Sequence, residues 1–422
     1  MAQTTINSTT AAVAGQEISI YEPTFGSNRA QEPQRASSSP IENLPLELVQ
    51  MILSFLPGPR ALRTAVLSCP LFYYSFLGFK ESITTQVLLN RIDISVLPEA
   101  MMSLEASELR SMNRASAHFY CMIHEITVDH LRQRPTARRS WSFLEALHLE
   151  RRHAIVEELS QDFISRSFKA IERRFELYFE RPGWKATHNE RRRIERALYR
   201  YDIFSAMFSR GCGETEGLAH DYGYQEDGFF QYFAPWENEQ LSCIHHHVER
   251  RAQVPSPSVP RRELPKGFWK DPKNARKALF CRLPLGLDYL VRVWDFLMTK
   301  EPPPGYHPQV VEQEEGFLCC GLANYRSLSD VEEESHREIK LKDLTPELEE
   351  LLVEKPFFRD PDSGPMETWR WAYQDHHNYE WVNEEVHVYQ ISWGYVMWDK
   401  ARMEDLGVLK VPWRNEFYLW AY

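Results

Sequence analysis

The segment from residue 43 to residue 59 constrains this chain more than any other, because it encodes a short helix together with both of its ends. Asn43 can cap a helix, and Pro45 loses nothing in a first turn whose N–H groups have no partner within the helix. The run Pro57-Gly58-Pro59 cannot continue a helix. The sequence therefore predicts a helix that ends close to Leu56.

Two apolar stripes run along this predicted helix when its residues are placed at about 100° per residue. The first stripe consists of Leu46, Val49, Leu53 and Leu56. The second stripe consists of Leu48, Met51, Ile52 and Phe55. A surface helix needs only one apolar stripe, of about 100° or a little more. This helix has more apolar surface than one core face requires, so either a partner or the rest of the same chain must cover the second stripe.

Two further short helices are predicted directly after this one. The second helix spans Arg60 to Cys69, between two prolines, and the third spans Leu71 to Phe79 and is rich in aromatic residues. Three helices in about forty residues lie near the lower size limit for independent folding. Such a unit cannot cover both stripes alone, so some of its apolar surface should dock on another surface.

The order and spacing of these segments resemble an F-box, and in particular the F-box-like domain of many fungal proteins. The match covers about forty of the 422 residues, from the opening Leu44-Pro45, through the second helix, which ends in Cys69, to the aromatic helix that follows. The chain departs from the family pattern in two places. Phe76 or Phe79 lies near the position of the usual closing Trp, and Pro-Gly-Pro links the first two helices where the family often has an acidic or Ser cap.

An F-box implies binding to the small Skp-type adaptor that joins F-box proteins to a cullin-RING ubiquitin ligase. The adaptor-facing positions carried over from the family pattern are Leu44, Pro45, Leu48, Ile52, Leu62 and Val66. Their role would be hydrophobic docking, so the resemblance implies a non-catalytic substrate receptor without a cofactor. The rest of the chain would recruit a protein client of unknown identity. The alternative is a structural or scaffold protein whose F-box-like helices pack within the chain.

Length, composition and charge are those of a folded chain of two or three domains. The 422 residues are 43% hydrophobic and 26% charged, with a formal net charge of −11. No nucleic-acid partner is expected, because phosphate binding favours a basic domain. No membrane partner is expected either, since the uncharged stretch 64–79 is shorter than the about 20 residues of a bilayer span. Seven cysteines without a CxxC pair, and no visible secretory signal, favour a cytoplasmic or nuclear protein.

The distribution of apolar residues divides the chain into three regions. Residues 1–40 are small and polar and are predicted to be a disordered tail. Residues 41–80 are the F-box-like module. Residues 81–422 are predicted to form a larger helical domain with irregular Trp-rich insertions, which would recognise the client. The expected fold class is therefore mainly α.

Several segments of the C-terminal region carry more specific signals. A buried helix face is predicted from Ile164, Phe168, Ile171, Phe175 and Tyr178, which recur at steps of three and four residues. Thr345 can cap a helix whose first turn contains Pro346. The blocks Trp236–Leu241 and Gly394–Asp399 are similar to blocks in the C-terminal regions of fungal F-box-like proteins, but no function is attached to them.

Three segments could carry chemistry, and in each a structural role is favoured. Cys243 and the imidazoles of His245–His247 are possible metal ligands, but three adjacent side chains on one helix cannot converge on one ion. Gly211–Gly217 has a glycine spacing that does not match a dinucleotide loop, which favours a flexible loop. Asp375–His377 has no matching nucleophile, which favours a surface loop. The sequence therefore predicts no catalytic residue and no metal site.

A basic run, Arg191–Arg193 with Arg196 and Arg200, lies on a predicted helix. Guanidinium groups bind carboxylate and phosphate with two parallel hydrogen bonds, so this run could recognise an acidic or phosphorylated peptide. Exposed charge runs more often form a solvated helix face. We favour the solvated face, with the arginines paired to the nearby Glu190 and Glu195.

Overall fold

The residues described by a computed structural model are 40–109, 112, 117–127, 140–174, 184–208, 228–253, 287, 339–353, 360–377, 382 and 390–410. Some sequence predictions lie outside these residues. They are the disordered tail before Pro40, the glycine-rich segment Gly211–Gly217, and the helix positions Phe175 and Tyr178.

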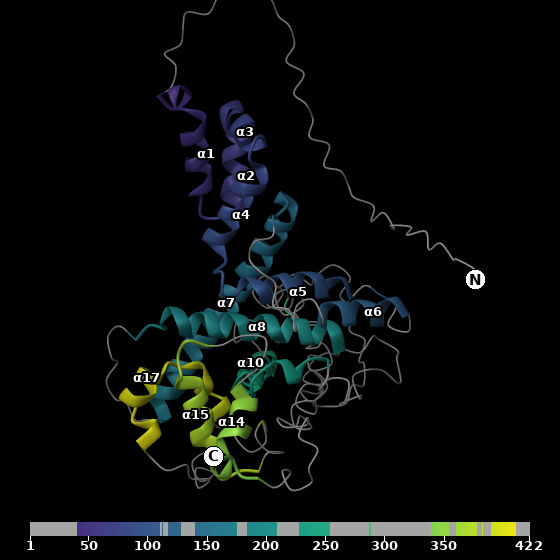
Figure 1. Ribbon diagram of the computed structural model, residues 1–422. Coiled ribbons are helices and arrows are strands. Elements are labelled where there is room, and N and C mark those ends of the chain that lie inside the picture. The colour runs from purple at the N-terminus through teal and green to yellow at the C-terminus, as the bar shows by residue number, and fades with distance from the viewer. Residues whose placement is uncertain are drawn as a thin grey trace, which may run out of the picture. The chain divides into compact units, whose positions relative to one another are not determined.

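The described residues form twelve α-helices and no β-strand, which confirms the prediction of a mainly α protein (Figure 1). The α-helices are α1 (Leu46–Ser54), α2 (Pro59–Ser68), α3 (Pro70–Leu77), α4 (Lys80–Arg91), α5 (Leu97–Leu109), α6 (Ala117–Ile126), α7 (Phe143–Arg174), α8 (His188–Phe208), α10 (Pro235–Gln253), α14 (Pro346–Val353), α15 (Gly364–Tyr373) and α17 (Lys400–Asp405). Short 3₁₀ helices are η1 (Pro40–Asn43), η4 (Phe230–Tyr232), η7 (Leu341–Asp343), η9 (Tyr395–Met397) and η10 (Val408–Lys410). No described helix combines the length and the apolar composition that crossing a membrane requires.

The chain divides into two units, Met1–Pro45 and Leu46–Tyr422. In the first unit, η1 is followed by a turn in which the Leu44 amide donates to the Ile41 carbonyl at 3.3 Å. Asn43 belongs to η1 and α1 begins only at Leu46, so the predicted cap at Asn43 is wrong. The reason is Pro45, because a proline disfavours the helical conformation of the residue before it.

In the second unit, α1 to α4 lie next to one another (Figure 1) and share a small apolar core. Helices α2 and α3 follow the predicted ranges within two residues, each with a proline at its first position. The core consists of Leu53, Leu62, Val66, Phe76, Ile83 and Val87, with Phe143 of α7 packed against it. Ile83 and Val87 belong to α4, so a fourth helix completes this core beyond the predicted module end at 80. We call α1 to α4 the four-helix module.

Helix α8 lies at the centre of a larger apolar core. Every residue from Arg193 to Phe208 is buried, and α8 packs against α5, α7 and α10. Helix α7 contributes to the same core through Phe163 and Phe168, and its first turn reaches the four-helix module. The single helix α7 therefore contacts both apolar cores.

The two sequence blocks near residues 236 and 394 lie together in the larger core. The side-chain amide of Gln240 in α10 donates to the Val396 carbonyl at 3.1 Å. Glu239, the residue before Gln240 in α10, accepts hydrogen bonds from the hydroxyls of Tyr373 at 3.2 Å and Tyr395 at 3.0 Å. The blocks therefore hold distant parts of the chain together, which is a structural role.

Gly394 and Gly407 both have positive φ, at 66° and 70°, but only Gly394 is crowded. A Cβ at Gly394 would overlap the buried ring of Phe163, whereas nothing lies within 4 Å of a Cβ at Gly407. We expect Gly394→Ala to lower the free energy of unfolding by about 2–4 kcal/mol, from backbone strain plus overpacking. Gly407→Ala, the matched control, should cost about 1 kcal/mol from strain alone. Urea denaturation of both variants measures the difference, and equal losses would contradict the packing argument.

Candidate docking surface

The second apolar stripe of α1 lies exposed on the protein surface. Its side chains Leu48, Met51, Ile52 and Phe55 are exposed by 42, 52, 42 and 78%, respectively. In the first stripe, Val49 and Leu53 are buried and Leu56 is half-buried, whereas Leu46 is exposed. The sequence prediction that α1 has more apolar surface than one core face uses is therefore confirmed. We call Leu48, Met51, Ile52 and Phe55 the α1 stripe.

The next two helices also expose large apolar side chains. They are Leu67 on α2, Tyr74 and Leu77 on α3, and Phe79 between α3 and α4. Phe79 lies near the position where the F-box pattern has its closing Trp. The pattern singles out none of the other three residues. Their exposure depends on which stripe of each helix enters the small core.

Leu62 and Val66 are buried, at 0 and 9% exposure, and belong to the small core. They therefore do not lie on the exposed surface, which corrects the sequence expectation that they face a partner. Helix α2 has a single apolar stripe, formed by Pro59, Leu62 and Val66. A helix with one apolar stripe buries it in its own core. The outward face of α2 instead carries Arg63, Thr64 and Leu67.

The other four predicted docking residues are accessible to different degrees. Leu48 and Ile52 lie exposed on the α1 stripe. Leu44 and Pro45 belong to the unit that ends at Pro45, where Leu44 is half-buried and Pro45 is exposed. A docking role for these four residues stays a prediction.

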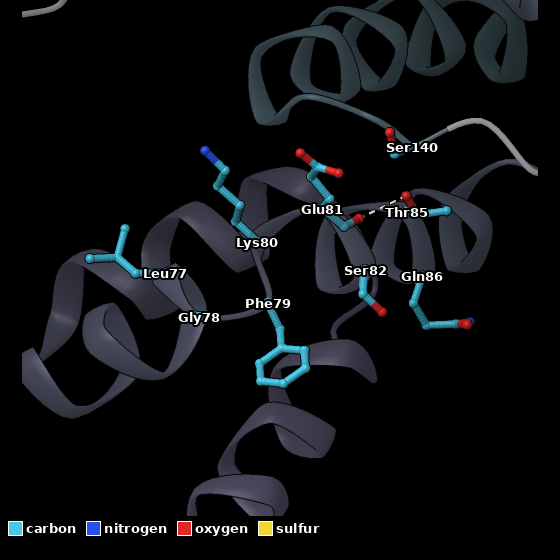
Figure 2. Close-up of a pocket in the computed structure, with 9 residues that line it drawn as sticks. All are labelled: Leu77, Gly78, Phe79, Lys80, Glu81, Ser82, Thr85, Gln86 and Ser140. Atoms are coloured by element: carbon cyan, nitrogen blue, oxygen red, sulfur yellow. Dashed lines mark hydrogen bonds between the residues drawn. The ribbon is translucent and has the colours of Figure 1, made fainter.

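An open pocket lies where α3 meets α4 (Figure 2). Its volume is about 620 Å³, and it is lined by residues 77–82, Thr85, Gln86 and Ser140, which lies just before α7. Lys80 and Glu81 are its only charged lining groups and are adjacent on one helix. The lining therefore offers no converging set of titratable groups for catalysis.

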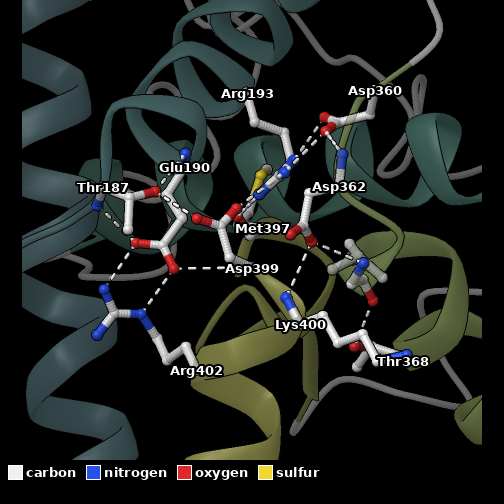
Figure 3. A network of polar contacts seen from close by, with 12 residues as sticks. Thr187, Glu190, Arg193, Asp360, Asp362, Thr368, Met397, Asp399, Lys400 and Arg402 are labelled. Atoms are coloured by element: carbon white, nitrogen blue, oxygen red, sulfur yellow. Dashed lines mark hydrogen bonds and ion pairs between the residues drawn. The ribbon is translucent and has the colours of Figure 1, made fainter.

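The basic run on α8 is largely buried, which corrects the expectation of a solvated face. Arg193 is fully buried and donates to both carboxylate oxygens of Asp360, at 2.8 and 3.0 Å (Figure 3). It also donates to the Met397 carbonyl at 2.5 Å and to Asp399 at 3.2 Å. The acidic partners of Arg193 come from residues more than 160 positions away, and the sequence around α8 contains no sign of them.

Glu190, one helical turn before Arg193, is buried as well. It does not pair with the neighbouring arginines of α8. Its carboxylate accepts two hydrogen bonds from Arg402, both at 2.7 Å, and one from the Asp399 amide at 3.1 Å (Figure 3). Pairing of the expected kind, within the helix, is seen between Arg192 and Glu195, at 2.7 Å. We call Glu190, Arg193, Asp360, Asp399 and Arg402 the ionic cluster.

Burial and pairing act in opposite directions on the pKa values of the ionic cluster. Burial alone would raise the pKa of Asp360, but the hydrogen bonds and charge of Arg193 outweigh it and hold that pKa below its usual value. For Asp399, burial outweighs the hydrogen bond from Thr187 and the charge of Arg193, so its pKa is raised. Burial alone would lower the pKa of Arg193. The hydrogen bonds and the charge of Asp360 outweigh burial, so the pKa of Arg193 is raised. Arg193 therefore stays charged inside the protein.

Arg200, two turns after Arg193 on α8, forms a second buried ionic contact. It contacts Glu99 of α5 at 3.0 Å and Glu237 of α10 at 2.9 Å, and its guanidinium lies 4.4 Å from the ring centre of Phe233. Burial opposes the charge of Arg200, but the two carboxylates raise its pKa. The arginines of α8 thus join helices, and Arg193, Arg196 and Arg200 are not available to bind a peptide.

His247 of α10 and Asp375, in the turn after α15, also make contacts within the protein. His247 is buried, lies 3.2 Å from Asp162 of α7, and packs edge-on against Phe163. Asp375 is exposed and pairs with Lys342 at 2.7 Å. Among the residues that the structure describes, no group of three or more His, Cys, Asp or Glu side chains could hold a metal ion.

Comparisons of this chain with protein-family models, with curated proteins and with solved structures found no match.

Proposed function

We propose that this protein is a substrate-receptor subunit of a cullin-RING ubiquitin ligase, in which α1 docks on a Skp-type adaptor. The observation that carries the proposal is the α1 stripe, three exposed apolar side chains of α1 together with Phe55, which directly follows the helix. Contiguous apolar surface of this kind often marks a protein–protein interface. The F-box-like sequence pattern over the same helix names the adaptor as the partner.

The larger helical domain has the complementary role in this proposal. It recruits a protein client by shape and hydrogen bonding, and the protein contributes no catalytic residue of its own. The ligase's other subunits supply the chemistry, and this chain brings the client to them.

The scaffold alternative requires that the chain's own later residues cover the α1 stripe. Leu48 and Ile52 are each exposed by 42%, and Phe55 by 78%. This exposure counts against a purely internal packing role for α1. The adaptor proposal gives these side chains a partner that removes them from water.

We expect the double variant Leu48→Asp, Ile52→Asp to lose the Skp-type adaptor. Interface hot spots each contribute about 2 kcal/mol or more, so the affinity should fall by a factor of about 100 or more. The change in stability should stay small, because surface substitutions usually stay within about 0.5 kcal/mol. Binding of recombinant adaptor to the full chain, measured by titration calorimetry, and its recovery from cells by affinity capture with mass spectrometry both test this result.

The control is Ile94→Asp, the same kind of change at one exposed side chain outside the α1 stripe. It should bind the adaptor as tightly as the unaltered chain. If the double variant still retains the adaptor, or if both variants lose it equally, the proposal that α1 is the docking helix is wrong.

A further inference from the structure

The turn between α1 and α2, Phe55 to Gly58, is held by side chains from outside both helices. We propose that Glu150 of α7 is a positioning residue that fixes this turn and thereby the presentation of the α1 stripe. The link to adaptor binding rests on the function proposed above. The contact itself stands on geometry alone.

Glu150 caps the N-terminus of α2. Its buried carboxylate accepts a hydrogen bond from the Arg60 amide at 2.8 Å, and the Arg60 guanidinium lies 3.9 Å away. The N-cap residue Gly58 has no side chain to do this, and Pro59, at the first helical position, has no N–H group. The Arg60 amide is therefore the first N–H donor of α2. A carboxylate at this end, the positive end of the helix dipole, stabilises the helix.

Gly58 leaves space for this carboxylate because it has no side chain. Its φ of 175° is extended backbone that any residue adopts, so backbone conformation does not require a glycine there. A Cβ at Gly58 would overlap the Glu150 Oε1 atom. The glycine thus provides space for a side chain that is 92 positions later in the sequence. The Pro-Gly-Pro link contains no acidic or hydroxyl side chain, and α7 supplies the missing acid.

The other side of the turn is held by α4. The side-chain amide of Asn90 donates to the carbonyls of Ser54 at 2.7 Å and Leu56 at 3.0 Å, which lie at the C-terminal end of α1. The next residue, Arg91, pairs with Glu157 of α7. Helices α4 and α7 together therefore hold the turn that contains Phe55, the most exposed side chain of the α1 stripe.

This arrangement makes the docking surface depend on the larger domain. Helix α7 contacts the core around Phe163 as well as the turn, so the position of the turn follows the position of α7. Removing the Glu150 carboxylate should release the turn without changing any residue of the α1 stripe. Adaptor affinity should then fall although the surface itself is intact.

The test uses the full chain with Glu150→Ala, with Glu150→Gln, and with Glu158→Ala as the control. Glu158 is an exposed residue of the same helix. Hydrogen exchange of the peptide that covers residues 58–67 should be about fivefold faster in Glu150→Ala, the size expected for a lost helix cap. Glu150→Gln keeps an acceptor oxygen for the Arg60 amide and should recover most of the protection. Glu158→Ala should exchange like the unaltered chain.

Adaptor binding is measured by calorimetry on the same variants. We expect a loss of about fivefold for Glu150→Ala, equal to the loss of protection because one contact governs both, and recovery in Glu150→Gln. Unchanged exchange in Glu150→Ala would overturn the capping role. Faster exchange with unchanged adaptor affinity would overturn the positioning role and leave the proposed function intact. If the unaltered chain does not bind the adaptor, the proposed function fails, and faster exchange in Glu150→Ala alone still supports the contact.

A pair of further variants tests the contact independently of the adaptor. As a single substitution, Gly58→Ala should speed hydrogen exchange over residues 58–67, because its Cβ displaces the Glu150 carboxylate. In a Glu150→Ala background the same change should have almost no effect on exchange, since there is no carboxylate left to displace. Effects that multiply in the double variant would show that the two positions act separately and would overturn the proposal.

Discussion

Arg193→Met is expected to lower the free energy of unfolding by about 3–5 kcal/mol, the usual cost of removing one partner from a buried ion pair. The variant leaves Asp360 and the half-buried Asp399 without the guanidinium that now contacts both. It also leaves the Met397 carbonyl without its donor. Urea denaturation followed by circular dichroism measures the loss.

Arg166→Ala is the matched control for this prediction. Arg166 pairs with Asp162 at 3.0 Å, but its side chain is 47% exposed, and exposed pairs contribute at most about 1 kcal/mol. A similar loss in both variants would mean that burial of the Arg193 pair adds nothing. That outcome would remove the ionic cluster as a main source of stability.

The stability of Arg193→Met should depend less on pH in the acid range than that of the unaltered protein. With Arg193 present, the pKa of Asp360 is lower in the folded than in the unfolded state. Its contribution is therefore complete above the unfolded pKa, near 3.8, and is lost as the pH falls through the folded pKa. Without Arg193, the pKa of Asp360 should be higher than in the unaltered protein, although Arg196, 3.1 Å away, and the Asp362 amide still lower it. The difference in stability between the variant and the unaltered protein should then shrink as the pH falls below the unfolded pKa, near 3.8.

Arg200→Met is expected to have an effect of similar size, again about 3–5 kcal/mol. It leaves two buried carboxylates, Glu99 and Glu237, close together without their shared cation. Because Arg200 joins α8 to both α5 and α10, the loss should appear in a single cooperative transition. Calorimetric unfolding at pH 7 measures it.

The companion variant is the triple replacement Arg200→Met, Glu99→Gln, Glu237→Gln. Removing the charges together with their partner avoids leaving two buried carboxylates without the guanidinium of Arg200, and such replacements are often close to neutral. The triple variant should recover much of the stability lost by Arg200→Met. A triple variant as unstable as the single one would show that packing, and not charge, accounts for the loss.

Local signals in the sequence predicted the helix ends well. The prolines at 59 and 70 mark the first residues of α2 and α3. The Thr345 hydroxyl accepts a hydrogen bond from the Leu348 amide at 3.4 Å, which confirms the predicted cap of α14. These features depend on neighbouring residues only, so a reading of the sequence finds them.

For α1, the sequence predicted that part of the apolar surface stays outside the core. For α2, the docking positions came from the family resemblance, and the structure buries them. Two stripes on α1 required that one stay outside the small core, and the structure leaves Leu48 and Ile52 there. Leu62 and Val66 were assigned to the surface by resemblance, although the single stripe of α2 was a signal for burial. The inclusion of α4 in the same core had no equivalent signal.

The sequence by itself determined the mainly helical architecture, the ends of the short helices and the surplus of apolar surface on α1, because these follow from the periodicity and chemistry of adjacent residues. Only the tertiary structure decided that the arginines of α8 are buried, that Glu150 caps α2, and that α7 contacts both cores. Each of these depends on charges and contacts between residues from about 40 to more than 160 positions apart, and their partners become neighbours only when the chain folds.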